Sequence, residues 1–203
     1  MAARRGDTYR GRSRQERAGD RRDRIVAAAL QLFGTRDYEA VTVADVCADA
    51  KVSKRYFYEH FTDREALLLA VYREQHDWLL AGVGRAAPQR PASLEDVLRP
   101  MMRTLVRMLR EHPERARVIY ADAPRMESRR RGVLREDAEF LGRLIARRIG
   151  LSMDPLRYER TLLALSAAIS EIVMDWRARD MADDPDLLVE HLTWLATSML
   201  AEH

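Results

Sequence analysis

Long hydrophobic runs and cysteine pairs are missing from this chain of 203 residues. No stretch of 18 consecutive apolar residues exists, so we expect no membrane-spanning helix and no membrane partner. The Arg-rich N-terminus lacks the apolar segment of a secretory signal. The single cysteine, Cys47, cannot form a disulfide within the chain. A reducing, cytoplasmic location is therefore the simplest expectation.

Catalytic and metal-binding motifs are also missing. The chain has no HExxH pattern, no glycine-rich phosphate loop and no Gly-x-Ser-x-Gly. His76, His112 and His191 are scattered, without the spacing of metal ligands. We therefore expect no metal, no cofactor and no catalytic residues. The alternative is a helical enzyme that uses a Met- and Trp-rich interior as its active site, and the lack of acid–base clusters argues against it.

Strand patterns are absent too, because the chain has neither alternating β-branched runs nor Asn-Gly and Asp-Gly hairpin turns. Apolar residues instead recur at helical spacing, and the fold class predicted is all-α. The expected helices are nine, near residues 20–34, 42–50, 53–61, 62–83, 93–112, 113–120, 128–149, 154–179 and 184–200.

Capping patterns predict where several of these helices begin. Thr42 with Asp45, Thr62 with Glu65 and Ser93 with Asp96 have the spacing of capping boxes. Asp154-Pro155 and Asp184-Pro185 each place an N-cap before a proline at the first helical position. Pro100 falls inside a helical pattern, which predicts a kink or a later helix start there.

Positive charge is concentrated in the first third of the chain. Residues 1–64 contain 14 basic and 10 acidic side chains, whereas the remainder contains 21 and 22. A local basic excess favours a polyanion partner, although a solvated tail is the alternative for the Arg-rich terminus itself. We expect a flexible basic arm at 1–19, a first helical domain at 20–64 that holds the rest of this basic excess, and a second helical domain at 65–203.

The first three helices follow the plan of a helix-turn-helix, in which a second helix braces a third that lies in the major groove. The third helix then needs one buried and one exposed face. Val52, Phe57 and Phe61 are expected to face the core. The opposite face carries Lys54, Arg55 and Tyr58, flanked by Tyr56 and His60.

The residues of this segment resemble the TetR/AcrR family of bacterial transcriptional regulators over about 45 positions. The matching pattern is Ile25-x-x-Ala28-Ala29-x-x-Leu32-Phe33, then Tyr38-x-x-x-Thr42-Val43-x-x-Val46, then Ala50-x-Val52-Ser53-x-x-x-Phe57-Tyr58-x-His60-Phe61-x-x-x-Glu65-x-Leu67. The resemblance implies a helix-turn-helix DNA-binding domain at 20–64, followed by a helical ligand-binding and dimerisation domain at 65–203. Beyond residue 75 no match is expected at the level of single residues.

The resemblance also implies roles for individual residues. Phosphate contacts are implied for Thr42, Tyr58, His60 and Arg64. Ser53 begins the reading helix, and Lys54, Arg55 and Tyr56 follow it toward the base edges. Lys54 and Arg55 suit the acceptors O6 and N7 of guanine.

Three positions depart from the family pattern, in which glycine is usual. Lys51 occupies the turn, where a positive φ would be strained. Arg55 adds a long donor to the reading helix, so the operator sequence cannot be inferred from relatives. Asp37 precedes Tyr38, and this departure is mild because Asp tolerates left-handed backbone.

The C-terminal domain contains large, soft apolar side chains that could line a ligand cavity, although core packing is the plainer role for most of them. Glu171 lies inside an apolar run, where a buried carboxylate would need a partner or ligand, and surface exposure is the alternative. The candidate pocket residues are Trp78, Met102, Leu105, Tyr120, Phe140, Glu171 and Met174.

An apolar stripe near the C-terminus predicts the surface of a homodimer. Its residues are Leu187, Leu188, Leu192, Trp194, Leu195 and Met199. A dimer places two reading helices about one DNA turn apart and requires a palindromic site on double-stranded DNA. Together with this dimer, the resemblance implies a repressor released by a small-molecule effector, with a regulator that has no such effector as the alternative.

Overall fold

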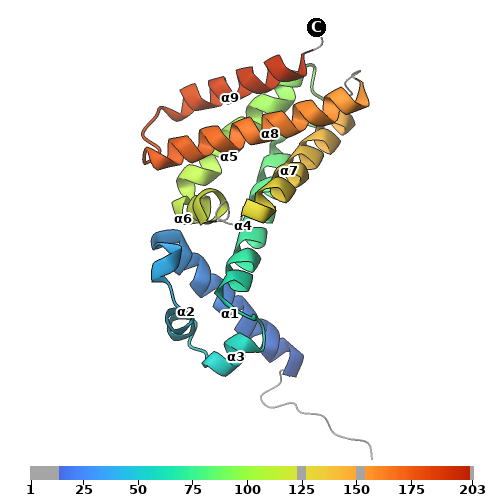
Figure 1. Cartoon of the computed structure of the whole chain (residues 1–203). Helices are drawn as coiled ribbons and strands as arrows, with labels where there is room; N and C mark the ends of the chain where they lie inside the picture. The colour runs from blue at the N-terminus through green and yellow to red at the C-terminus, as the bar shows by residue number, and fades with distance from the viewer. Residues whose placement is uncertain (1–13, 123–126, 150–153, 202–203) are drawn as a thin grey trace, which may run out of the picture. The chain divides into compact units, whose positions relative to one another are not determined.

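The computed structural model describes residues 14–122, 127–149 and 154–201, all as helices, turns and loops. Its helices are α1 (Arg14–Thr35), α2 (Val43–Asp49), α3 (Lys54–Tyr58), α4 (Arg64–Ala86), α5 (Leu94–Glu111), α6 (Pro113–Arg117), α7 (Glu127–Arg148), α8 (Pro155–Ala178) and α9 (Pro185–Leu200). Short turns, η1 (Tyr38–Ala40) and η2 (Val118–Asp122), precede α2 and follow α6. The described residues confirm the all-α class and the nine helices (Figure 1). No helix among them is long and apolar enough to cross a membrane.

Two compact units divide the chain, Met1–Val71 and Tyr72–His203, and the division falls within α4. In the first unit α1 packs on α2 and α3. Ile25, Ala29 and Phe33, which recur at helical spacing on α1, are fully buried. Cys47 of α2 is a free thiol in this core, as expected, and burial raises its pKa.

Helix starts in the first unit differ from the prediction at two places. α1 begins at Arg14, earlier than the expected Asp20. The predicted capping box of Thr62 with Glu65 is wrong. The Asp63 carboxylate accepts the amide of Ala66 at 2.7 Å, and α4 begins one residue later than that box requires. Asp63 displaces Thr62 because an ionised carboxylate is the stronger acceptor for a first-turn amide.

The second unit is built around α5, which packs against α9, while α7 packs against α8 (Figure 1). Its fully buried side chains include Leu98, Leu109 and Trp176. Gly142 allows the close approach of α7 and α8, because a Cβ there would lie 2.7 Å from a methyl group of Leu162.

Caps in the second unit agree with the sequence. Ser93 and Asp96 form a complete capping box at the start of α5. Asp154 and Asp184 accept first-turn amides at 2.9 Å, each with proline next in the chain. Of the two alternatives predicted at Pro100, a kink or a later helix start, the later start is wrong, because α5 already begins at Leu94 and continues through the proline.

Candidate nucleic-acid interface

The start of α2 is organised by Thr42. The Thr42 hydroxyl accepts the amide of Asp45 at 3.2 Å and donates to the Asp45 carboxylate at 2.6 Å. The amide of Thr42 donates to the same carboxylate at 2.8 Å. These bonds hold the pKa of Asp45 below its usual value. Thr42 is thus fixed at a helix N-terminus, where first-turn amides favour an anion, but a phosphate would compete with Asp45 for its hydroxyl hydrogen.

The turn between α2 and α3 holds Lys51 in a positive-φ geometry, in which a side chain is strained. Lys51 has a φ of 53°, in the left-handed region that favours glycine. Asp37, by contrast, has an extended backbone with φ −64°, so that departure from glycine needs no left-handed geometry. Ser53 occupies the N-cap position of α3, but its hydroxyl forms no capping hydrogen bond.

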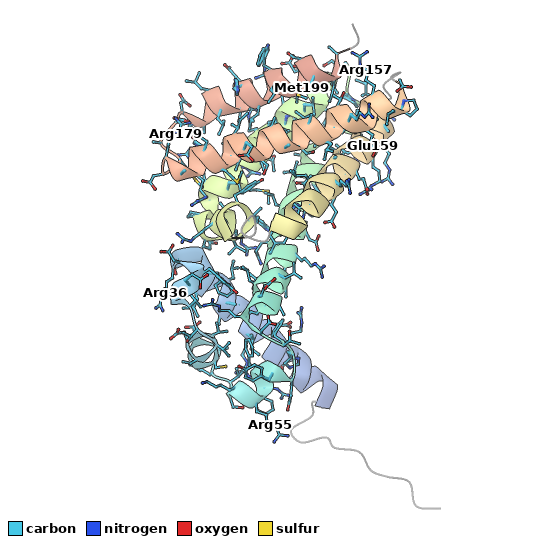
Figure 2. All side chains as sticks on the ribbon, in the orientation of Figure 1. Arg36, Arg55, Arg157, Glu159, Arg179 and Met199 are labelled. Atoms are coloured by element: carbon cyan, nitrogen blue, oxygen red, sulfur yellow. The ribbon has the colours of Figure 1, made fainter. Side chains whose placement is uncertain are left out.

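α3 has the two faces that were predicted. Phe57 is fully buried, and its ring centroid lies 5.8 Å from that of Phe61. On the opposite side, Tyr58 is 58% exposed and the Arg55 side chain is 86% exposed. Figure 2 shows Arg55 extending away from the ribbon. The exposed face of α3 therefore offers cationic and hydroxyl donors to a partner.

Two residues near α3 escaped the sequence prediction. Glu59 lies one turn after Arg55 and pairs with it at 3.4 Å. Arg21 of α1 lies over the ring of Tyr56, 4.4 Å from its centroid. The i,i+4 spacing could have revealed the first pair. The second joins residues far apart in the sequence, and no local pattern predicts it.

Arg64 was predicted to contact phosphate, and the structure gives its guanidinium several contacts within the protein. Nη1 donates to the carbonyls of Tyr38 and Val41 at 3.0 and 2.7 Å. Nη2 donates to Glu39 at 3.1 Å, and the guanidinium lies 4.0 Å from the Tyr38 ring centroid. Arg64 thereby connects the start of α4 to the segment that leads into Thr42.

His60 was also predicted to contact phosphate. Its Nε2 is enclosed and has no hydrogen-bond partner among the described residues. A phosphate contact from His60 would need Nδ1 or a rearranged side chain. Tyr38 lies against Phe33, with ring centroids 5.6 Å apart.

A family model described as "Bacterial regulatory proteins, tetR family" matches residues 25–71. The chain is 28% identical to the HTH-type transcriptional regulator TcmR of Streptomyces glaucescens over 189 residues, which cover 84% of this chain and 79% of TcmR. It is 29% identical to the solved structure of the multidrug binding protein EbrR complexed with imidazole, with a TM-score of 0.65 and coverage of 86% and 94% of the two chains. Residues 25–71 therefore form a domain of the TetR family of bacterial regulatory proteins, and the rest of the chain has the fold of the solved TetR-family structures.

The extent of similarity differs among other relatives of this chain. FadR of Bacillus halodurans, a fatty acid degradation regulator, shares the fold at 18% identity, with a TM-score of 0.68 and coverage of 89% of this chain and 95% of FadR. Five curated relatives are matched over only 18 to 51% of their own length. A domain of a family of regulatory proteins agrees with the expectation of a regulator rather than an enzyme.

The predicted pocket residues lie at different depths in the second unit. Met102 and Leu105 are buried on α5, whereas Trp78, Tyr120, Phe140 and Met174 are half-buried. Glu171 is exposed on α8, which is the alternative that the sequence left open. Metal ligands are not grouped anywhere in the described ranges, in which no three His, Cys, Asp or Glu side chains could hold an ion.

A buried polar contact between α4 and α7 was missed by the sequence. His76 Nε2 lies 2.7 Å from Asp137 Oδ1, and the ring of Tyr72 stacks on His76 with centroids 5.3 Å apart. Burial opposes protonation of His76, but the hydrogen bond and charge of Asp137 outweigh it and raise the histidine pKa. Burial also raises the pKa of Tyr72, whose enclosed hydroxyl has no partner among the described residues.

A second polar contact lies one residue earlier on α4. Arg115 Nη1 donates to the buried Gln75 at 2.6 Å, and its guanidinium lies 4.5 Å from the Trp78 ring centroid. Trp78 in turn meets His112 edge to face, with ring centroids 5.1 Å apart. The sequence position of Gln75 could have indicated its burial, because Gln75 continues the helical spacing of the apolar residues Leu68, Tyr72 and Leu79.

The predicted dimer residues separate into two groups on α9. Leu188 and Leu192 are buried within the chain's own second unit, where α9 packs on α5, and are not available to a partner. Leu187 and Trp194 are 65% and 61% exposed. Leu195 and Met199 are half-buried beside them. The exposed apolar face of α9 is thus narrower than the predicted stripe.

Proposed function

We propose that this chain is a dimeric, ligand-responsive transcriptional repressor that binds a palindromic operator through α3. The observation that carries the proposal is the construction of α3, in which Phe57 anchors one face while Arg55 and Tyr58 stand exposed on the other. A helix held in this way can enter the major groove with its donors already outside the core. The protein would act in the cytoplasm, together with its DNA.

Base edges and phosphates are assigned to different residues in this proposal. Lys54, Arg55 and Tyr56 read bases, with the guanidinium of Arg55 leaving Glu59 to reach guanine acceptors. Both partners of that ion pair are exposed, so separating them costs little. Phosphate contacts come from Thr42, Ser53, Tyr58, His60 and Arg64 and set the register without reading sequence.

Dimerisation uses the exposed face of α9 together with α8, which packs beside it. Leu187 and Trp194 supply the apolar anchors, and an isologous interface brings each of them against the same surface of the partner. Two copies of α3 about one DNA turn apart then select a palindrome.

Effector control is assigned to the second unit. The similarity to EbrR, a multidrug binding protein, supports a small-molecule ligand. Its contacts would come from the soft apolar side chains Met102 and Trp78 and from the buried His76–Asp137 pair. Because His76 lies on α4, whose N-terminal end carries the Arg64 contacts, a ligand that displaces α4 would disturb the segment that positions Thr42.

The first experiment measures binding of the purified full chain to the DNA upstream of its own gene, across a salt series. The proposal predicts sequence-selective binding that weakens steeply as salt rises, because phosphate contacts release counterions. Failure to bind any DNA tested, or binding insensitive to salt, would contradict it.

A thermal-shift screen of small apolar and cationic compounds then tests effector control. A ligand that binds the folded state raises the melting temperature, and it should also release the DNA. A compound that stabilises the protein without releasing DNA would contradict the repressor mechanism. If no compound binds while DNA selectivity persists, the regulator without a small-molecule effector is favoured.

A further inference from the structure

α1 and α3 of the first unit meet through a contact that the proposed DNA interface does not include. The guanidinium carbon of Arg21 lies 4.4 Å from the ring centroid of Tyr56. This distance is within the range of a cation–π interaction, which is stronger for a planar guanidinium that can stack on the ring. Tyr56 is 39% exposed, so one side of its ring is covered by Arg21 and other parts remain open to solvent.

The neighbouring arginine on α1 is in a different electrostatic position. Arg22 lies 5.8 Å from the Phe61 ring centroid and is 3.9 Å from the carboxylate of Asp23. For Arg21, the described part of the chain provides no ion pair, and its Nε is enclosed without a hydrogen-bond partner. Arg21 therefore holds a positive charge beside the reading helix, and no carboxylate among the described side chains contacts it.

We propose that Arg21 is a positioning residue for sequence recognition. Its guanidinium fixes the orientation of the Tyr56 ring before DNA arrives, and its terminal nitrogens donate to the phosphate next to the base pair that Tyr56 meets. This inference rests on the proposed function, in which α3 reads DNA.

Two measurable effects are expected from these two roles. Fixing the Tyr56 ring lowers the entropy that binding must remove, which sharpens the preference at one base pair. The phosphate contact adds to affinity on every sequence and to the dependence of affinity on salt. If Arg21 only stabilised α1, removing its side chain would not selectively change the preference at that base pair or the salt dependence of DNA affinity.

The experiment compares five forms of the full chain, which are wild type, Arg21→Ala, Arg21→Lys, Tyr56→Ala and the double variant Arg21→Ala with Tyr56→Ala. Arg24→Ala is the matched control, because Arg24 is an exposed arginine on the same helix that contacts no aromatic ring among the described residues. Each form is used to select sites from random DNA, and its dissociation constant is measured across a salt series. Circular dichroism melting confirms that each form is folded.

Tyr56→Ala identifies the base pair that Tyr56 reads, because preference relaxes there. Arg21→Ala is expected to relax preference at the same base pair by about threefold to tenfold. It should also reduce the magnitude of the salt slope by about one. Arg21→Lys should restore the salt slope but only part of the preference, because an ammonium group keeps the charge and loses the planar stack. Arg24→Ala should leave the preference unchanged.

In the double variant, Arg21→Ala should cause no further loss of preference once Tyr56 is absent. The inference is overturned if Arg21→Ala leaves the preference of an otherwise selective protein intact. It is also overturned if Arg21→Ala relaxes preference equally whether or not Tyr56 is present. Absence of selectivity in the wild type would contradict the proposed function itself and the inference with it.

Discussion

The helices α3 and α9 share one construction and differ in what they expose. Each buries an apolar anchor in its own unit, Phe57 in α3 and Leu192 in α9. The open face of α3 carries Arg55 and the hydroxyl of Tyr58, whereas that of α9 carries Trp194. The buried side chains hold each helix in place, and the exposed ones determine its partner. Donors and charge suit a phosphate backbone, and a large apolar side chain suits another protein surface.

The largest effect is expected from removing the anchor of α3. Phe57→Ala should lower the free energy of unfolding of the first unit by about 3–5 kcal/mol, because it leaves a cavity where a fully buried ring stood. Urea unfolding followed by circular dichroism measures this loss. The control is Tyr58→Ala, which should change stability by less than about 0.5 kcal/mol yet weaken DNA binding. If both variants lowered stability equally, the distinction between the buried anchor and the exposed face of α3 would be wrong.

The same test applies to α9. Leu192→Ala should lower the stability of the subunit by about 2–5 kcal/mol, because Leu192 is fully buried. Trp194→Glu should leave the subunit folded but shift it to monomer, since a charge would replace an apolar contact. Sedimentation velocity distinguishes the two results. If Trp194→Glu remained a dimer, α9 would not form the dimer interface.

Arg64→Ala should produce a smaller loss, about 1–3 kcal/mol, because the carbonyls of Tyr38 and Val41 lose their donor. DNA affinity should fall alike on all sequences, since Arg64 positions the segment before Thr42 rather than a base. Dissociation constants on selected and unrelated DNA measure this. A changed base preference would contradict the positioning role.

The two units also differ in their cores, because the buried polar residues of the described segments all belong to the second unit. The pKa of His76 is raised above its ordinary 6.5, since the hydrogen bond with Asp137 outweighs burial. The stabilisation from this pair is therefore complete below pH 6.5 and is lost as pH rises through the raised pKa. Urea unfolding at several pH values should show this decline, which we expect to be smaller than the Arg64 effect.

Asp137→Asn should remove that pH dependence, whereas Glu136→Gln, at an exposed neighbouring position, should retain most of it. A pH profile of Asp137→Asn identical to that of the wild type would exclude the His76–Asp137 pair as its source.

The smallest effect is expected at the turn before α3. Lys51→Gly should stabilise the first unit by about 0.5–1 kcal/mol, because relief of the left-handed strain exceeds the entropy that glycine loses on folding. Differential scanning calorimetry measures the rise in melting temperature. A fall in melting temperature would show that the lysine side chain contributes contacts that offset its backbone strain.

The first unit was predictable because its signals are local. Thr42 and Asp45 are three residues apart, and Phe57 and Phe61 are separated by one helical turn, so spacing alone indicates their roles. The contact of Arg21 with Tyr56 joins two helices and has no such signal. Arg64 shows a second limit of prediction from sequence. Its guanidinium, expected to contact phosphate, donates to backbone carbonyls of the protein, and no pattern of side chains predicts such a contact.

The second unit was less predictable because apolar residues on α9 serve both its core and its surface. Leu188 and Trp194 belong to one sequence stripe, and only the packing of α9 on α5 separates them. His76 and Asp137 were missed because two polar side chains stabilise each other only across helices that are distant in sequence. Ser93 with Asp96, by contrast, needed only local spacing.

Site selection from random DNA, with the wild type and Arg55→Ala compared in parallel, tests the central claim most directly. The wild type should enrich a palindrome with half-sites centred about 10 base pairs apart, and its affinity should fall steeply with salt. Arg55→Ala should change the preferred base at one position in each half-site. No enriched sequence for the wild type, or an unchanged preference with a uniform loss of affinity for Arg55→Ala, would contradict the reading role of α3.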